Sequence, residues 1–305
     1  MNMTYQRPRR LRRVQLATPA SSEKMSAKAA ASAADHVFLD LEDAVAPSAK
    51  VGARATAVNS LRNLDWGRKT RCVRINDLGT KYAYEDIITV VEGAREHLDT
   101  IMVPKVTSAS DVLFVATLLN QIEMNIGLAK PIGVEVLIEE VQGLQNIDEI
   151  CKAHPRLECA IFGMGDYSAS QAMAVRSGGD NDYPGDIWYY PRFRLALAAR
   201  ASGIDPVDGP YGNYKNPDQY RKEAELGMIV GCVGKWAIHP SQIDIALDVF
   251  TPKRDAVDAA RRLSSEYAKA EAAGLGAVSI DGIMVDAATV RMLKNTLDKA
   301  DLIGM

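Results

Sequence analysis

The stretch GVEVLIEE, residues 133–140, is a short run of apolar and β-branched residues that ends on two carboxylates. Such runs, bounded by turn residues, are typical of buried strands. Seven more occur along the chain, each followed by a stretch with helical periodicity: RVQLATP (13–19), HVFLDLED (36–43), RCVRIND (71–77), TIMVPKV (100–106), ECAIFGMGD (158–166), IDPVDG (204–209) and GKWAIHP (234–240). Eight strand–helix repeats predict an α/β fold, a (β/α)8 TIM barrel over residues 1–250. An open doubly wound sheet is the alternative, although no G-x-G-x-x-G motif follows the first run.

The intervening segments carry helix signals. Apolar residues recur every three or four positions over residues 111–127, and residues 216–218, Asn-Pro-Asp, are a helix-start signal. From residue 251 the pattern changes to a long amphipathic helix over 255–274, a turn-rich piece and a closing helix. We therefore expect residues 251–305 to form a helical extension that acts as a lid on an active site, with a neighbouring subunit's site as the favoured one. The alternative is a cap packed on the chain's own barrel.

Composition narrows the classes of function. A net charge of -3 provides no basic field for nucleic acid, and the basic patch RPRRLRR (7–13) is interpreted as a solvated N-terminal segment. No apolar run approaches the roughly 20 residues that span a bilayer, and the N-terminus lacks the apolar core of a secretion signal, so we expect no membrane partner and a cytoplasmic location. The four cysteines lack C-x-x-C spacing, which predicts no disulfide and no zinc site. The chain has only four histidines, which argues against a His-rich metal cluster or a multi-histidine acid–base relay. We therefore expect acids and arginines to carry the chemistry.

Charged residues close the predicted strands. In a TIM barrel the active site lies at the carboxyl ends of the strands. Here those ends carry several acids, two cations and an amide: Asp40, Glu42, Asp43, Arg74, Asn76, Lys105, Glu139, Glu140 and Asp166. The sequence therefore predicts a ring of charged side chains around one polar pocket.

Glu139 and Asp166 follow consecutive strands and should be neighbours in the barrel wall. Two carboxylates brought together repel each other unless one is protonated or a cation lies between them. An all-oxygen ligand set suits Mg2+, and Mn2+ as the other candidate. The alternative is a structural ion pair of Glu139 with Arg74 or Lys105, and spacing leaves both readings open.

Strand alternation decides which side chains face inward. Glu135, Leu137 and Glu139 share one side of their strand, so Glu140 faces the helices or the loop if Glu139 points into the barrel. An inward Arg74 would clamp a carboxylate or an enolate oxygen with two donors. Its alternative role is to neutralise Glu42 on the neighbouring strand.

Several segments resemble those of the malyl-coenzyme A lyases, within the larger family that includes the citrate lyase β subunit: FLDLEDAVAPSAK, VRIND, VPKV, EVLIEEVQGL, FGMGDYSAS, DGPYGNY and GKWAIHPSQI. The resemblance extends from about Arg13 to the final helix. It implies a magnesium-dependent aldolase that cleaves a 3-hydroxyacyl-coenzyme A (CoA) thioester by a retro-Claisen route. Malyl-CoA would give acetyl-CoA and the 2-oxo acid glyoxylate, and β-methylmalyl-CoA would give propionyl-CoA.

The resemblance also implies roles for individual residues. It places the metal on Glu139 and Asp166 and the oxyanion-clamping cation at Arg74. Asp286 would be the acid or base, reaching into an adjacent subunit's site in a homotrimer or hexamer, with Asp281 as its rival. The implied coenzyme contacts are Ala17, Thr18, Lys28, Gly165, Ile238 and His239.

Other outcomes remain open. A citramalyl-CoA lyase would release pyruvate, and a malyl-CoA thioesterase would release free malate. A Schiff-base aldolase could use Lys105 or Lys235. A non-catalytic CoA-binding subunit is the alternative outside enzymes. The loop over residues 177–186 would shape the acyl pocket or form a surface connection.

Overall fold

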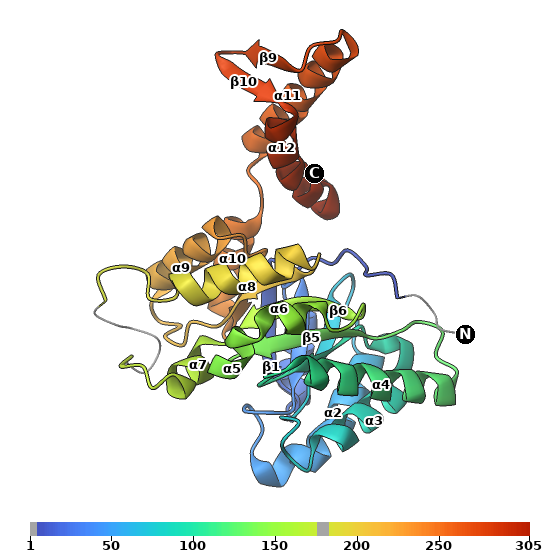
Figure 1. Ribbon diagram of the computed structural model, residues 1–305. Helices are drawn as coiled ribbons and strands as arrows, with labels where there is room; N and C mark the ends of the chain where they lie inside the picture. Colours follow the sequence, from blue (N-terminus) through green and yellow to red (C-terminus); the bar gives the residue numbers. More distant parts are fainter. Residues whose placement is uncertain (1–4, 176–182) are drawn as a thin grey trace.

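The protein is described here by a computed structural model, covering residues 5–175 and 183–305. Eight parallel strands follow one another in sequence order and close into a barrel, because β1 pairs with both β2 and β8 (Figure 1). Their bounds are β1 Val14–Pro19, β2 His36–Asp40, β3 Thr70–Arg74, β4 Thr100–Val103, β5 Gly133–Ile138, β6 Leu157–Phe162, β7 Asp205–Asp208 and β8 Lys235–Ala237. The barrel prediction is confirmed, and the open sheet is wrong.

The strands are apolar on both faces because each faces the barrel interior on one side and the helices on the other. On β5, Leu137 packs inside the barrel with Phe38 and Trp236, whereas Val136 and Ile138 pack in the outer core. Burying one such side chain contributes about 2 kcal/mol, so this two-sided burial fixes which strand residues point inward. The predicted alternation along β5 is confirmed.

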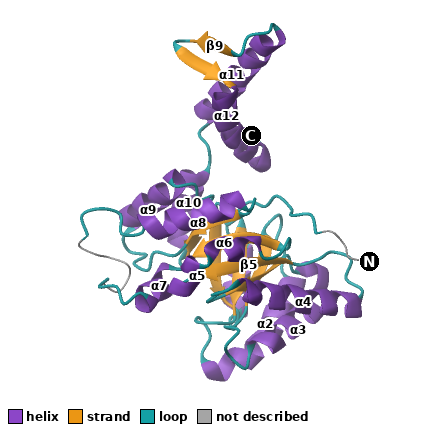
Figure 2. Ribbon diagram, in the orientation of Figure 1, coloured by secondary structure: helices purple, strands orange, loops and turns teal. Residues whose placement is uncertain are grey.

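Helices surround the barrel and account for the periodic segments between the strands (Figure 2). The expected helix over 111–127 runs from Ala109 to Ile126, begins at a Ser108–Asp111 capping box and ends at Gly127 with φ 64°. The helices are α1 Glu23–Ala30, α2 Lys50–Asn63, α3 Ala83–Ala94, α4 Ala109–Ile126, α5 Val141–Gln145, α6 Ile147–Lys152, α7 Met164–Ser170, α8 Tyr189–Ala201, α9 Pro217–Ile229 and α10 Ile243–Phe250, with short 3-10 turns η1 Pro47–Ala49, η2 Arg95–His97 and η3 Pro240–Gln242. Within the described residues, no helix has the length and apolar character to cross a membrane.

The basic segment 7–13 is only partly solvated: residues 7–9 are exposed as expected, whereas Arg12 is buried, so for that residue the interpretation is wrong. It crosses the amino-terminal end of the barrel and binds acids there. Arg10 Nε lies 2.6 Å from Glu158, and the buried Arg12 reaches Glu158 at 2.7 Å and Asp205 at 2.9 Å. Composition could not reveal this, because the acids lie about 150 to 200 residues away in sequence.

The extension stands away from the barrel and has its own small core (Figure 1). It comprises α11 Arg254–Ala272, the antiparallel hairpin β9 Ala277–Ile280 with β10 Ile283–Asp286, and α12 Ala287–Ile303. The two-residue turn Asp281–Gly282 has φ values of 50° and 79°, as Asp-Gly hairpin turns require. The segment expected to be rich in turns is thus an antiparallel β-hairpin.

Candidate active site

Arg74, at the end of β3, is held by Asp40, the last residue of β2, and by Glu42 just after that strand. Its Nε and Nη2 bind the two oxygens of Asp40 at 2.7 and 2.6 Å, and its Nη1 lies 2.8 Å from Glu42. All three residues are buried. Asp40 also accepts the backbone N–H groups of Glu42 and Ala44, so the same carboxylate fixes the guanidinium and the loop after β2. The ion pair with Glu42, which was the alternative role considered for Arg74, is confirmed.

Lys105 joins the acids of three strand ends. Its Nζ lies 2.5 Å from Glu42 and 3.3 Å from Asp166, and its backbone N–H donates to Glu139 Oε1 at 3.0 Å. Its backbone is left-handed, with φ 50°. A lysine in this conformation carries strain of about 1 kcal/mol or more, which the surrounding contacts must offset.

Glu139 is a buried carboxylate whose surroundings favour its protonated form. Burial raises its pKa to about 8; the charge of Arg74 opposes this rise, while Glu42 and Asp166 add to it. The two cations considered as its ion-pair partners are engaged elsewhere, Arg74 by Asp40 and Glu42, and Lys105 by Glu42 and Asp166. An additional cation beside Glu139 would therefore relieve repulsion among buried acids.

The surroundings of Glu139 and Asp166 fit a small divalent cation. Asp166 lies in the first turn of α7, and its carboxylate is 42% exposed, leaving room for water or substrate oxygens. A Cβ on Gly163 would come within 2.7 Å of Glu139 Oε2, so glycine at this position leaves room for the Glu139 carboxylate. A Cβ on Gly165 would meet nothing within 4 Å, which places this position at open space. Glu140 points away and accepts from Ser170 at 2.6 Å, as expected.

The implied coenzyme contacts fall into two groups. Ala17 and Thr18 on β1 lie beside Ile238 and His239, which follow β8, because β1 and β8 pair side by side. His239 caps η3 and stacks on Tyr214 with ring centroids 4.4 Å apart, so it is positioned by local contacts. Lys28 is exposed in the last turn of α1. Ala17, Thr18, Ile238 and His239 therefore lie together because the barrel closes between β1 and β8.

The two tail acids lie on the extension. Asp286 caps α12, accepting from the Thr289 N–H at 2.8 Å and from its hydroxyl at 2.9 Å. These hydrogen bonds hold the pKa of Asp286 below its ordinary value. Asp281, in the hairpin turn, pairs with Arg262 at 2.8 Å. Neither is among the contacts of Arg74 or Lys105 in the chain's own barrel.

Lys235 does not face the pocket. It is fully buried between the barrel and the helices, where its Nζ lies 2.5 Å from Asp208 and 3.3 Å from Glu223, and Arg192 binds the same two acids. The sequence patterns did not predict this network. The signal was a charged residue in β7 and in β8 at positions that alternate with the inward Val207 and Trp236.

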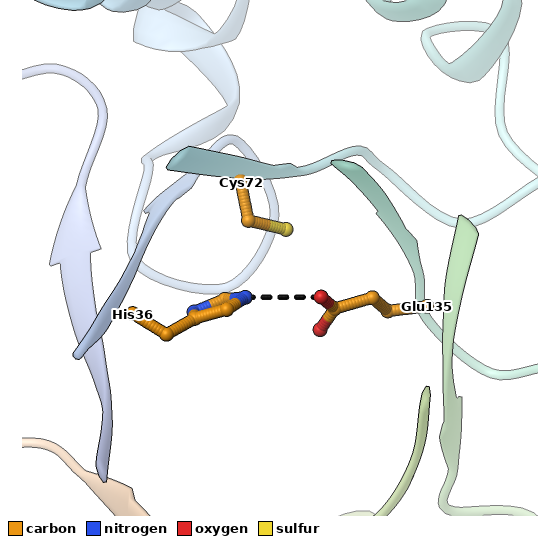
Figure 3. Close-up of side chains that lie close together, drawn as sticks. All are labelled: His36, Cys72 and Glu135. Carbon is orange, nitrogen blue, oxygen red and sulfur yellow. Dashed lines mark hydrogen bonds and ion pairs between the residues drawn. The ribbon is translucent and has the colours of Figure 1, made fainter. Parts of the chain in front are cut away.

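A third polar group fills the amino-terminal end of the barrel interior. His36, Cys72 and Glu135 lie together, with His36 Nε2 3.1 Å from Glu135 Oε1 (Figure 3). The same oxygen accepts from Thr100 at 3.1 Å and Arg12 at 3.2 Å. Although burial opposes ionisation, the interactions with His36 and Arg12 hold the pKa of Glu135 well below its usual range. Because this oxygen already has three protein partners, we interpret the group as a structural hydrogen-bond network at the amino-terminal end of the barrel.

The fold and the acid-and-arginine site at its carboxyl end define the class of protein. The chain matches the HpcH/HpaI aldolase/citrate lyase family over residues 13–240 and belongs to that family. It is 40% identical over 306 residues to an L-malyl-CoA/β-methylmalyl-CoA lyase of Rhodobacter capsulatus, covering 97% of this chain and 96% of the relative.

Two further proteins are similar to this chain. A (3S)-malyl-CoA thioesterase of Cereibacter sphaeroides is 34% identical over 287 residues, covering 94% of this chain and 93% of the relative. The structure of protein CitE from Mycobacterium tuberculosis in complex with magnesium, acetoacetate and coenzyme A is 30% identical. Its TM-score is 0.73, and the match covers 94% of this chain and 97% of that one.

Proposed function

We propose that the chain is a Mg2+-dependent carbon–carbon lyase that reversibly cleaves L-malyl-CoA to acetyl-CoA and glyoxylate, and β-methylmalyl-CoA to propionyl-CoA and glyoxylate. The observation that carries the proposal is the convergence of Glu139 and Asp166 on Lys105, next to the buried Arg74. The 40% identity to a lyase with these substrates supports the choice of thioester. A cytoplasmic location is part of the same proposal.

Glu139 and Asp166 would hold the metal, and Mn2+ is the other ion this oxygen set would accept. The bound ion would act as a Lewis acid toward the oxygens of the 2-oxo acid. Glu139 would lose its proton on metal binding, because its raised pKa reflects burial among other acids. The complex of protein CitE with magnesium supports this assignment.

Arg74 would stabilise the enolate of the thioester fragment. Its guanidinium is fixed by Asp40 and Glu42, so it needs little rearrangement as negative charge develops on the thioester oxygen. Lys105 would balance Glu42 and Asp166 before the metal binds. Thr18, Ile238 and His239 would contact the coenzyme, together with Ala17, Gly165 and Lys28.

Asp286 would move the proton at the thioester α-carbon, in the site of an adjacent subunit. Its place on the extension, outside the contacts of its own Arg74 and Lys105, supports a trimer or hexamer in which one subunit completes another's site. The extension would then act as a lid between subunits. Asp281 remains the rival within the same hairpin.

A thioesterase is the second candidate, favoured by the 34% identity to a (3S)-malyl-CoA thioesterase. In that reaction water attacks the thioester carbonyl, and the products are malate and free CoA. Product analysis with malyl-CoA separates the two, since only the lyase yields glyoxylate. Assays with pyruvate in place of glyoxylate test the citramalyl-CoA alternative.

The deciding experiment assays the full-length protein with malyl-CoA, before and after EDTA and after Mg2+ is restored. The proposal expects stoichiometric glyoxylate and acetyl-CoA, loss of activity in EDTA, and recovery with Mg2+. Activity retained in EDTA, together with a borohydride-trapped adduct on Lys105, would instead establish a Schiff-base aldolase. No turnover with any of these thioesters would favour a non-catalytic CoA-binding subunit.

A further inference from the structure

A cavity of about 660 Å³ lies at the amino-terminal end of the barrel, opposite the carboxyl-end pocket. Segment 7–13 forms one wall, the starts of β7 and β8 form another, and α12 of the extension forms the third. In Figure 1 the dark blue N-terminal segment runs along the side of the barrel that faces α12. The volume is that of a site for a small organic molecule.

The acids of this cavity are already paired. Arg12 binds Glu158 at 2.7 Å and Asp205 at 2.9 Å, while Asp298 pairs with Lys294 at 2.8 Å. These carboxylates are therefore largely neutralised by protein cations. Any excess of positive charge in the cavity comes from the cations that remain.

Three arginines of the cavity donate mainly to backbone carbonyls, which carry no full negative charge. Arg7 Nη1 binds a carbonyl at 2.7 Å, Arg9 Nη2 binds one at 2.9 Å, and Arg200 Nη2 binds one at 2.9 Å. Among the described residues, Arg200 pairs with one carboxylate, that of Asp205, at 4.0 Å. Each guanidinium keeps further N–H donors for a ligand.

Lys299 adds a fourth cation from α12. In the described part of the chain it makes no hydrogen bond or ion pair, although it lines the cavity and is half-buried. Desolvation and the charge of Arg200 lower its pKa, and Asp205 only partly offsets them. A half-buried ammonium near Arg200, in a cavity that Arg7 and Arg9 also line, is unfavourable unless an anion joins these cations.

We propose that this cavity binds a small organic anion with at least two negative charges, held by Lys299, Arg9 and Arg200. The apolar part of the ligand would lie against Phe250 and Leu302, which also line the cavity. Arginine and lysine donors at these positions suit phosphate esters and polycarboxylates alike.

Such a ligand would bridge the barrel and the extension. Arg9 already touches α12 through the carbonyl of Asp298, and the chain between α10 and α11 is only residues 251–253. A ligand that contacts Lys299 on one side and Arg200 on the other should restrain α12 against the barrel. Trypsin cleavage next to the exposed Lys253 and Arg254 provides a readout of that restraint.

The test titrates metal-free, full-length protein at low ionic strength with fructose 1,6-bisphosphate and with citrate, by calorimetry. We expect saturable binding of at least one probe, weakened at least tenfold by Lys299→Met and by Arg9→Met. Arg291→Met is the matched control, because Arg291 is an exposed cation of the same helix that does not line the cavity. The bound probe should also slow tryptic cleavage after residues 253 and 254.

Lys299→Met removes a half-buried ammonium that has no partner among the described residues, so its melting temperature should not fall below that of the unsubstituted protein, and lost binding then reports on the site. Binding of the bisphosphate alone, or of citrate alone, identifies the anion class. The proposal is overturned if neither probe saturates, or if Lys299→Met and Arg291→Met bind the probe equally well.

Discussion

The backbone N–H of Lys105 donates a hydrogen bond to Glu139 Oε1 at 3.0 Å. The left-handed backbone of Lys105, with φ 50°, directs the amide at Glu139 while its ammonium reaches Glu42 and Asp166. One residue thus contacts both proposed metal ligands through different groups.

Asp166→Asn should weaken Mg2+ binding and cut turnover by at least about 100-fold, because the amide oxygen lacks the charge that attracts the ion. The measurements are the Mg2+-induced shift of the melting temperature and the rate of glyoxylate formation. Glu140→Gln is the control, since Glu140 is the neighbouring acid that points toward Ser170. Near-normal metal binding by Asp166→Asn would remove this residue from the site.

Arg74→Met should destabilise the fold by about 3 to 5 kcal/mol, because it leaves Asp40 and Glu42 buried with one fewer cation. Arg74→Lys should cost less stability but still slow turnover strongly, since an ammonium cannot reproduce the two-point contact with Asp40. Urea unfolding measures the first effect. Arg221→Met, at an exposed pair with Asp248, should cost less than about 1 kcal/mol; equal losses at the two sites would contradict the argument.

The stability of the metal-free protein should fall as pH rises toward about 8. The folded state raises the pKa of Glu139 from 4.5 to about 8, so between these values it retains a proton that the unfolded chain releases. Stability contributed by this protonation is complete below 4.5 and is lost as pH rises through 8. Urea unfolding in EDTA at pH about 6 and about 8.5 should show a smaller loss for Glu139→Gln than for the unsubstituted protein. A pH-independent difference between the two proteins would show that Glu139 does not titrate in this range.

Asp286→Asn should slow turnover by about 100-fold or more while leaving CoA affinity nearly unchanged. Asparagine still caps the helix, so the change removes the acid without removing the cap of α12. Asp281→Asn is the comparison for its rival. If Asp281→Asn alone is inactive, the acid is Asp281.

The same variant tests whether sites are shared between subunits. Mixed oligomers of inactive Asp286→Asn and Asp166→Asn chains should regain about a quarter of full activity, because random mixing places both intact groups in about a quarter of the shared sites. Activity no higher than that of the separate variants would show that each chain uses its own Asp286.

Much of the site could be expected from the sequence because strand ends converge in a closed parallel barrel. The eight runs fixed the order of the strands, so Arg74, Glu139 and Asp166 had to lie at one end. The partners of those residues were harder to infer. Asp40 holds Arg74 in a two-point contact, and Lys105 turns its backbone to reach Glu139, because of side-chain and backbone geometry that residue order does not specify.

The sequence by itself determined the barrel, its extension and the family, because apolar periodicity and motif order are local properties of the chain. Tertiary structure alone decided the ionic contacts of segment 7–13, the outward burial of Lys235 and the unpaired Lys299 at the amino-terminal cavity. These depend on residues far apart in sequence, whose charges interact strongly only once folding removes the water between them.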